Sequence, residues 1–323
     1  MRLSVILLAC LIVITPATAA DIAVTATPVP LNPADPGQAT VDSLDYVAGF
    51  ALDSAAPEWG GYSGMVLAPD GSSLVAVSDV GHWIKLALKQ DAAGKLTGVG
   101  AARLEPLLDE AGKPVAGKEW SDAEAITLTA DGHFVVSFER HHRLWRYASV
   151  DGVPSGPASA IAVPPEVTAL PENGGIEALA AVGSDGFVLI AESADVGQSS
   201  RLWIRVKERG DTWMAGTVDR SEGFEPTDVS EQPDAYSLLL ERKYSEAEGP
   251  AARISILGPL VADQPTFGAQ HLAVLRRPLS VDNFEAIGQR MTAGGETFIY
   301  LLSDDNQSDS QRTLLLQFRM RPE

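Results

Sequence analysis

The chain has 323 residues, 45% of them hydrophobic, which is enough to bury a sizeable core in one or two domains. Its formal net charge of −19 at pH 7 argues against nucleic acid and anionic lipid as partners. The same charge suits a soluble protein, or one that concentrates divalent cations.

Residues 1–20 have the pattern of a secretory signal peptide. A basic Arg2 precedes an apolar run over residues 3–14 and a small-residue signal over residues 17–19. We expect cleavage near residue 20, which places the mature protein in the periplasm or outside the cell and removes Cys10, the only cysteine. A lipoprotein signal at Cys10 is disfavoured because the apolar run continues past it. Any site must then be built from oxygen and nitrogen atoms.

Later segments give no sign of membrane insertion, because none reaches the roughly 20 apolar residues that a membrane helix needs. Residues 21–40 hold four prolines among small and polar residues, which predicts an extended leader without regular structure. Residues 41–323 are expected to form one domain.

One sequence unit recurs five times from residue 63 onward. Each copy has a polar residue before small apolar positions, a turn such as Asp70-Gly71, an apolar run that ends in an acidic residue, and a basic residue that opens another apolar run. A length of this kind holds four short antiparallel strands, which make one blade of a β-propeller. The copies begin 48 to 61 residues apart, at Ser63, Glu124, Glu177, Glu225 and Glu285.

The predicted fold class is therefore all-β, a single β-propeller of four-stranded antiparallel blades. Five blades are counted, and a sixth stays open if a degenerate copy lies in the long first or fourth interval. The last unit ends after its third strand, so residues 44–52, otherwise unassigned, are expected to supply its outer strand. This pairing of N- and C-terminal strands would close the ring and leave no exposed edge.

Acidic residues recur at two positions of the unit, and hairpin geometry places both at the same end of each blade. We expect them to form two rings around one mouth of the central channel. The first ring holds Glu124, Glu177, Glu225 and Glu285, with Ser63 in the same register. The second holds Asp79, Glu139, Glu192, Glu241 and Asp304.

So many like charges need cations nearby, and the sequence offers two sources. Arginines open the third strands, where an ion pair with each acidic pair would lock the blades together. A bound hard cation such as calcium is the other source, because it takes six to eight oxygen ligands. The arginines are Arg143, Arg201, Arg253 and Arg312, with Lys85 near the same register.

Further polar residues near this mouth are candidates for chemistry. His82 and His141 follow second-strand acids, where a histidine could act as general acid or base. Asp304, Asp305 and Asn306 begin a polar run that could supply oxygen ligands or simply form a solvated loop. The sequence lacks a nucleophile elbow, a phosphate-binding loop, a dinucleotide fingerprint and a zincin motif.

Several of these segments resemble one known family, the bacterial phytase-like domain, also called the esterase-like activity of phytase family. The resemblance extends from about residue 44 to residue 320, and it implies a secreted β-propeller that hydrolyses ester or phosphoester bonds. The segments are Gly61–Met65, Asp122–Ile126, Gly174–Leu179, Asp282–Ile287, Leu302–Asn306 and Gln311–Leu315.

The resulting expectation is a monomeric phytase-like hydrolase that acts on a small-molecule ester or phosphoester and holds calcium with its carboxylates. Two alternatives stay open: a non-catalytic propeller in which the acid–arginine pairs are structural, and a lactonase-like metal hydrolase. The candidate metal ligands are Asp79, Glu124, Glu139, Glu177, Glu192, Glu285, Asp304 and Asp305. The candidate catalytic residues are His82, His141, Arg143, Arg201 and Arg312.

Overall fold

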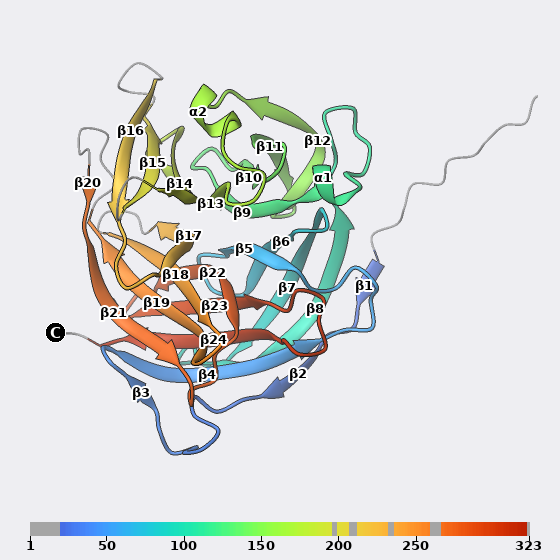
Figure 1. Cartoon of the computed structure of the whole chain (residues 1–323). Helices are drawn as coiled ribbons and strands as arrows, with labels where there is room; N and C mark the ends of the chain where they lie inside the picture. Colours follow the sequence, from blue (N-terminus) through green and yellow to red (C-terminus); the bar gives the residue numbers. More distant parts are fainter. Residues whose placement is uncertain (1–19, 196–198, 207–211, 232–235, 259–265, 322–323) are drawn as a thin grey trace, which may run out of the picture.

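The computed structural model describes residues 20–195, 199–206, 212–231, 236–258 and 266–321. Five sheets stand around a common centre as the blades of a β-propeller (Figure 1), which confirms the predicted fold and the count of five. The described helices are two single turns, α1 (Lys118–Ser121) and α2 (Pro165–Thr168). No helix within the described ranges is long and apolar enough to cross a membrane.

Each blade has four antiparallel strands in sequence order from the centre outwards, except that the last blade takes its outer strand from near the N-terminus. Blade 1 holds β5 (Tyr62–Leu67), β6 (Ser73–Ser78), β7 (His82–Gln90) and β8 (Leu96–Pro106). Blade 2 holds β9 (Ala123–Leu128), β10 (Phe134–Phe138), β11 (Arg143–Val150) and β12 (Val153–Ile161). Blade 3 holds β13 (Ile176–Val182), β14 (Gly186–Asp195), β15 (Ser199–Arg205) and β16 (Trp213–Asp219).

Blade 4 holds β17 (Glu225–Glu231), β18 (Ser237–Ser245), β19 (Gly249–Leu257) and β21 (Ala269–Arg276). Blade 5 holds β22 (Asn283–Met291), β23 (Thr297–Asp304), β24 (Thr313–Met320) and β4 (Leu44–Asp53). Short strands extend three of the outer edges: β1 (Ala20–Ile22) pairs with β8, β2 (Thr25–Pro28) and β3 (Thr40–Val41) pair with β4, and β20 (Thr266–Phe267) runs parallel to β16.

The outer strand of blade 5 is the segment that the sequence assigned to it. β4 pairs antiparallel with β24, from Leu44 opposite Met320 to Leu52 opposite Thr313. The expectation for residues 21–40 needs a correction, because β1 and β2 give this leader regular structure. Its prolines are compatible with that, since proline is tolerated where a strand ends or lies at a sheet edge.

The hydrophobic core is divided among the five spaces between neighbouring blades. Second strands are apolar on both faces because alternate residues point to opposite neighbours. In β10, Val136 packs in the cluster shared with blade 1 and Val135 in the cluster shared with blade 3. Tight turns let the first and second strands form a hairpin: Gly71 and Gly132 have φ of 71° and 82°, a region that favours glycine.

The five innermost strands contact one another in a closed cycle, in the order β5, β9, β13, β17 and β22, and β22 returns to β5. Each of them carries a β-bulge at its second or third residue. This bulged residue has no direct partner on the second strand of its blade. A bulge re-aims the side chain of the extra residue. The bulged residues are Ser63, Glu124, Glu177, Thr227 and Glu285.

Candidate functional site

The bulges and the strand pairing define two rings of side chains at one end of the channel. The inner ring consists of the five bulged residues. The second ring consists of residues that lie on the second strands or directly follow them, each opposite the position two residues before a bulge. In blade 2, for example, the Glu139 amide donates to the carbonyl of Asp122 over 2.8 Å. The second ring is Asp79, Glu139, Glu192, Arg242 and Asp304.

Blade 4 departs from the predicted rings. Glu225 lies opposite Arg242 and the bulge falls on Thr227, so the residues at the ring positions are Thr227 and Arg242 rather than Glu225 and Glu241. Glu241 lies one residue earlier on β18. Because neighbouring residues of a strand face opposite sides, this shift turns Glu241 away from the mouth.

A cavity of about 230 Å³ opens where the two rings meet. Its lining is dominated by charge, with eight carboxylates and three cations. The carboxylates are Asp79, Asp122, Glu124, Glu139, Glu177, Glu192, Glu285 and Asp304, and the cations are Lys118, Arg140 and Arg242. The predicted gathering of acids at one mouth is therefore present, although blade 4 contributes a base to it.

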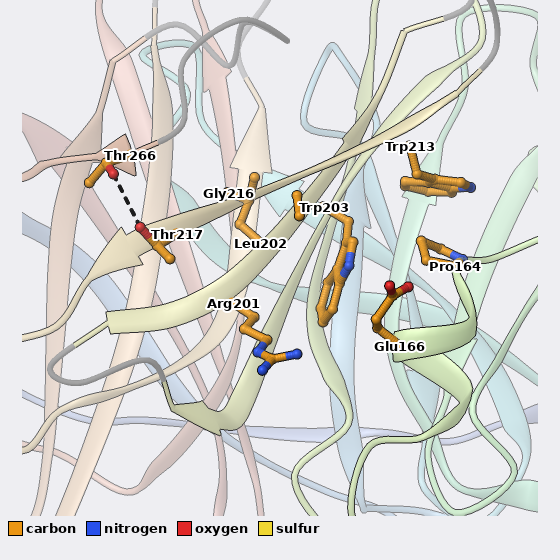
Figure 2. Close-up of a pocket in the computed structure, with 10 residues that line it drawn as sticks. Pro164, Glu166, Arg201, Leu202, Trp203, Trp213, Gly216, Thr217 and Thr266 are labelled. Carbon is orange, nitrogen blue, oxygen red and sulfur yellow. Dashed lines mark hydrogen bonds between the residues drawn. The ribbon is translucent and has the colours of Figure 1, made fainter.

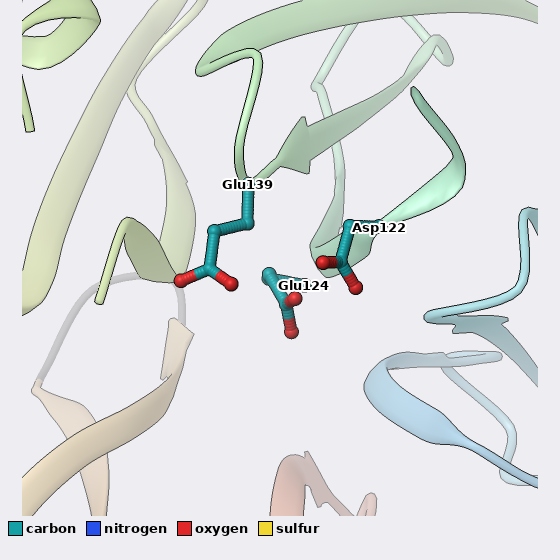
Figure 3. Close-up of side chains that lie close together, drawn as sticks. All are labelled: Asp122, Glu124 and Glu139. Atoms are coloured by element: carbon teal, nitrogen blue, oxygen red, sulfur yellow. The ribbon is translucent and has the colours of Figure 1, made fainter. Parts of the chain in front are cut away.

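Three of these carboxylates come especially close together. One oxygen each from Asp122, Glu124 and Glu139 lies within 4.8 Å of the other two, and the three side chains converge on a common space (Figure 3). Asp122 and Glu124 lie on either side of Ala123, the first residue of β9, and Glu139 directly follows β10. This spacing is short enough for all three to contact one cation.

Protein groups hold two members of this trio. Lys118 on α1 donates to Asp122 Oδ1 over 2.5 Å, and Arg140 Nε donates to Asp122 Oδ2 over 2.6 Å. The Glu139 Oε1 atom accepts the backbone N–H groups of Gly174 and of Gly175, the latter over 2.9 Å. Such contacts fix the orientation of the carboxylates and leave Glu139 Oε2 available to a ligand.

The far side of the cavity is organised by Arg242. Its guanidinium lies 2.8 Å from Glu192 Oε1 and 2.7 Å from Glu285 Oε1. It also donates to Asn283 Oδ1 over 2.9 Å, and Asn283 in turn donates to Glu285 over 2.7 Å. A single arginine thus bridges carboxylates from blades 3 and 5.

Glu124 and Glu177 lack such support. Among the described residues, neither carboxylate has a hydrogen bond or an ion pair with the protein. Burial is the largest cause that raises the pKa of each of them well above its usual value, and the neighbouring carboxylates raise it further. One oxygen of Asp79, Oδ1, is also buried without a hydrogen-bond partner in the described structure.

Two more acids of the cavity have raised pKa values. Burial raises the pKa of Glu285 to about 8, against the opposing effect of Arg242. Burial also raises the pKa of Asp304 to about 7, although the Asn306 amide donates to its Oδ1 over 2.7 Å. Because both pKa values lie near neutrality, these groups can gain or lose a proton under ordinary conditions.

The donor set suits a hard divalent cation. The candidate ligand atoms are carboxylate oxygens, which are donors that calcium prefers. Several of these oxygens have no protein partner in the described structure. The residues that fit best are Asp122, Glu124 and Glu139. Glu177 lies close enough for the carboxylates of Glu124 and Glu139 to raise its pKa. Without a cation, the site can instead hold protons.

The predicted arginines lie elsewhere. Arg143 packs over the rings of Phe138 and Trp145, with its guanidinium carbon 4.0 and 4.1 Å from their centroids. Arg201 on β15 lines a separate pocket of about 540 Å³ beside Trp203 (Figure 2). Arg312 is exposed, 3.5 Å from Asp282. For Arg143 the cause is strand alternation: it lies opposite Phe138, the residue before Glu139, and therefore shares the face of Phe138, away from the mouth.

One predicted acid–arginine pair does form, inside blade 4. Arg253 contacts Glu241 through two nitrogens, at 2.8 Å and 2.5 Å, and Ser255 donates to the same carboxylate over 2.9 Å. Glu241 and Arg253 are 0% and 1% exposed. This pair belongs to the blade interior and does not reach the cavity.

The histidines and Asp305 also lie outside the cavity lining. His141 stacks on Trp120 of α1, with ring centroids 3.8 Å apart, and its Nε2 lies 2.9 Å from Glu119. Its neighbour Arg143 donates to the Trp120 carbonyl over 2.5 Å. Both residues therefore hold α1, which carries Lys118 into the site.

His82 is half-buried, and burial lowers its pKa. Asp305 links loops next to the site rather than lining it: it accepts hydrogen bonds from the Gly61 amide at 3.2 Å and from the Thr313 hydroxyl at 2.8 Å. Sequence reasoning missed Lys118, Asp122, Arg140 and Arg242. Asp122 was detectable, since it lies two residues before Glu124 and an acid at that spacing belongs to the same mouth.

One family model matches most of the chain. The family model named Phytase-like, described as esterase-like activity of phytase, matches residues 57–307. None of the curated proteins matches the chain. Similar solved structures include a protein of unknown function from Dyadobacter fermentans, with 14% identity, a TM-score of 0.45 and coverage of 90% of this chain and 87% of that one.

Two further solved structures are similar at the same low level of identity. A putative gluconolactonase has 14% identity and a TM-score of 0.43, and the match covers 95% of this chain and 94% of that one. Virginiamycin B lyase from Staphylococcus aureus has 10% identity and a TM-score of 0.38, with coverage of 92% and 99%.

Proposed function

Because this chain belongs to the Phytase-like family, we propose that it hydrolyses phosphoric or carboxylic ester bonds in the acidic cavity at the mouth of its channel. The observation that carries the proposal is Glu177. Its side chain lines the cavity and is buried, at 7% exposure, without a protein partner in the described structure. A buried carboxylate in that state is costly, and a bound cation or a proton removes the cost.

The proposed cation is calcium, with Asp122, Glu124 and Glu139 as its ligands. When bound, it would neutralise these carboxylates and draw electron density from a coordinated ester oxygen. Lys118 and Arg140 both contact Asp122, so that this carboxylate is already oriented before any ligand arrives. Glu139 is oriented in the same way by two backbone N–H groups.

Proton transfer falls to the acids with pKa values near neutrality. Asp304, with a pKa of about 7, can accept a proton from an attacking water or return one to the leaving group. Arg242 has a side chain that is 35% exposed, so its guanidinium can face a substrate oxygen on which negative charge develops. Arg242 is the basic member of the second ring, whose other four members are acids.

The size of the site limits what it can enclose. A cavity of about 230 Å³ holds a reacting group and little more. A larger groove of about 1000 Å³ adjoins it and shares Arg242 and Asn306 with its lining. The rest of a small-molecule substrate would lie in this groove, which also contains Arg312.

The cellular setting is part of the proposal. The N-terminal pattern supports export to the periplasm or beyond, and the acidic composition supports a soluble monomer that binds no nucleic acid. The N-terminal residue of protein recovered from the periplasm tests the first point, because export predicts cleavage near residue 20. Light scattering of the purified protein tests whether it is a monomer, and the mass of a dimer would contradict this proposal.

The function is tested on chelator-treated protein to which calcium is returned. Calcium is expected to raise the melting temperature and to permit turnover of 4-nitrophenyl phosphate, 4-nitrophenyl acetate or a simple lactone, which together separate the phosphoric, carboxylic and lactone activities. Glu124→Gln should weaken both the calcium-induced rise in melting temperature and the calcium-dependent turnover at least tenfold. Glu119→Gln is the matched control, because Glu119 is 71% exposed and lies outside the cavity.

The results separate the alternatives. Calcium binding without turnover of any of the three substrates would indicate the non-catalytic binding propeller. No calcium response and no turnover would contradict the proposed function as a whole. Turnover that is equal in the Glu124→Gln and Glu119→Gln proteins would place the reaction outside this cavity.

A further inference from the structure

Two cations of the protein already contact Asp122, one of the three proposed metal ligands. The Lys118 ammonium lies 2.5 Å from Asp122 Oδ1, and it also lies 2.7 Å from Asp79 Oδ2 on the neighbouring blade. Arg140 Nε donates to the other oxygen, Asp122 Oδ2, over 2.6 Å. The Asp122 side chain is only 1% exposed. Each oxygen of this buried carboxylate is therefore shared with a positive group of the protein before any metal arrives.

A metal ion on Asp122 would meet one of these groups at close range. Calcium lies 2.3–2.6 Å from its oxygen ligands, so an ion on Asp122 Oδ1 would be within about 5 Å of the Lys118 nitrogen. Positive charges at this distance repel each other. An ammonium group has no acceptor atom and so cannot become a ligand itself. The metal ion and Lys118 therefore compete for the same oxygen.

Lys118 is the cation of the described cavity lining that can leave most easily. Its side chain is 50% exposed, compared with 29% for Arg140 and 35% for Arg242. Its charge lies at the end of a flexible four-carbon stem, which can turn into solvent by side-chain rotation alone. Arg242 is held more firmly, because its guanidinium contacts two carboxylates and one amide oxygen.

The backbone that carries Lys118 is fixed by contacts that do not involve its ammonium group. Trp120 of α1 stacks on His141, with ring centroids 3.8 Å apart. Arg143 donates to the Trp120 carbonyl over 2.5 Å. The α1 turn therefore stays in place when the Lys118 side chain turns away, and the side chain can return when the metal leaves.

We infer that Lys118 determines the cation specificity of the acidic cavity, because its ammonium group holds the carboxylates until a divalent ion displaces it. A monovalent ion carries the same charge as the ammonium group that it would replace, and it therefore gains little from the exchange. A divalent ion gains about twice the electrostatic attraction. Lys118 thus excludes sodium and potassium and sets the calcium concentration at which the site fills. The cation is that of the proposed function, on which this inference rests, but no step of the exchange requires turnover.

The first test is a calorimetric titration of the chelator-treated full chain with calcium. Lys118→Met removes the charge and keeps a stem of similar length, and it should raise the calcium affinity about tenfold or more. Lys118→Arg keeps the charge and should stay close to the wild-type affinity. Lys113→Met is the matched control, because Lys113 is exposed between β8 and α1 and its side chain has no ion pair in the described structure.

The second test measures melting temperatures in a chelator, with sodium chloride or tetramethylammonium chloride at equal ionic strength. Sodium can approach carboxylate oxygens, whereas methyl groups keep the charge of tetramethylammonium away from them. The difference between the two salts should be the same for the wild-type and Lys113→Met proteins. It should be larger by several degrees for Lys118→Met, because sodium then takes the place of the missing ammonium group.

The outcomes separate this inference from the proposed function. A Lys118→Met protein that binds calcium no more tightly than Lys113→Met would overturn the inference, and so would an equal effect of the two salts on all three proteins. Either result leaves the proposed function standing as long as the wild-type protein binds calcium. The expected affinities without turnover of any ester would instead contradict the proposed function and support the role of Lys118. Calcium binding by neither the wild-type nor the Lys118→Met protein would overturn both.

Discussion

The guanidinium of Arg242 lies 2.8 Å from Glu192 Oε1, although the two residues hold the same register position in neighbouring blades. The repeat therefore supplies its own counter-charge: four blades place an acid at this position and blade 4 places a base. The same guanidinium reaches Glu285 on the next blade, at 2.7 Å. One substitution within an otherwise acidic ring thus links blades 3, 4 and 5 at the mouth of the channel.

Replacement of Arg242 by glutamine should lower the free energy of unfolding by about 1–3 kcal/mol. Loss of one partner of a buried ion pair costs more than this, and the 35% exposure of the Arg242 side chain reduces the effect through solvent screening. Urea unfolding measures it. The loss should be larger at pH 9 than at pH 6, because Glu285, with a pKa of about 8, keeps its proton at the lower pH.

Arg319→Gln is the control for this substitution. Arg319 contacts Asp45 at 2.9 Å and Glu296 at 3.2 Å, but its side chain is 44% exposed. Such surface pairs contribute little, and we expect a change within about 0.5 kcal/mol. Equal effects of Arg242→Gln and Arg319→Gln would show that the bridge between the blades contributes no more than a surface pair.

The cation-free protein should lose stability as the pH rises from about 5 to 8. Glu285 and Asp304 have folded-state pKa values of about 8 and 7, above their ordinary values, so the folded state binds more protons than the unfolded state across this range. Stability is then greatest below the unfolded pKa and falls as the pH rises through the folded one, by ~1.4 kcal/mol for each unit of pKa difference.

Melting temperatures measured with a chelator at several pH values test this slope. Added calcium should flatten it, because a bound cation favours the ionised carboxylates. A melting temperature that rises between pH 5 and pH 8 in the chelator would contradict the raised pKa values of the cavity. A slope that is the same with and without calcium would contradict the cation site.

Glu177→Gln should have opposite effects on stability and on calcium binding. Removal of a buried charge without a protein partner should raise the melting temperature of the cation-free protein at pH 8. The same change removes an oxygen donor and a negative charge from the cavity, so the calcium affinity should fall about tenfold or more. Calorimetric titration measures the affinity, with Glu119→Gln as the control.

A destabilised Glu177→Gln protein would support the alternative in which the acids of the mouth are structural clasps. That alternative requires a cation beside Glu177, and Arg242, the cation of the second ring, instead contacts Glu192 and Glu285. The direction of the change in melting temperature therefore distinguishes the two interpretations without any assay of activity.

The sequence predicted the propeller because its signals are local. Turns such as Asp131-Gly132 and continuous apolar strands such as Phe134–Phe138 recur with one order in every unit, and each needs only its own neighbours to be recognised. The gathering of Glu124, Glu177 and Glu285 followed from the same repetition. It did not need side-chain detail, since equivalent ends of innermost strands meet around one axis.

The register of blade 4 could not be predicted in this way. An alignment of the acids of the five repeats assigned Glu225 to the inner ring and Glu241 to the second ring. The bulge at Thr227 shifts these two ring positions to Thr227 and Arg242. A bulge adds one residue without a mark in the sequence, and a shift of one residue reverses the face of every side chain. The misplaced role of Arg143 has a different origin, because this residue lies opposite Phe138 rather than Glu139 and therefore faces away from the mouth.

The pair of Glu241 and Arg253 provides the clearest separation of structural from functional acids. Glu241→Gln should lower the free energy of unfolding by about 3–5 kcal/mol, because it leaves the Arg253 guanidinium, 1% exposed, with only a distant counter-charge among the described residues, the exposed carboxylate of Glu222 at 3.9 Å. The calcium affinity of the folded protein should not change, since Glu241 lies on the other face of β18 from the cavity. Urea unfolding and calorimetric titration give the two values.

Substitution of both residues by methionine completes the test. An apolar pair of similar size buries no charge, so the double variant should recover most of the stability that Glu241→Gln loses. A double variant as unstable as the single one would show that the contacts of Ser255 with Glu241 and of Ser221 with Arg253, at 2.9 Å each, matter more than the charge. A weakened calcium affinity in either variant would place Glu241 in the functional site after all, and would restore the ring that the sequence first predicted.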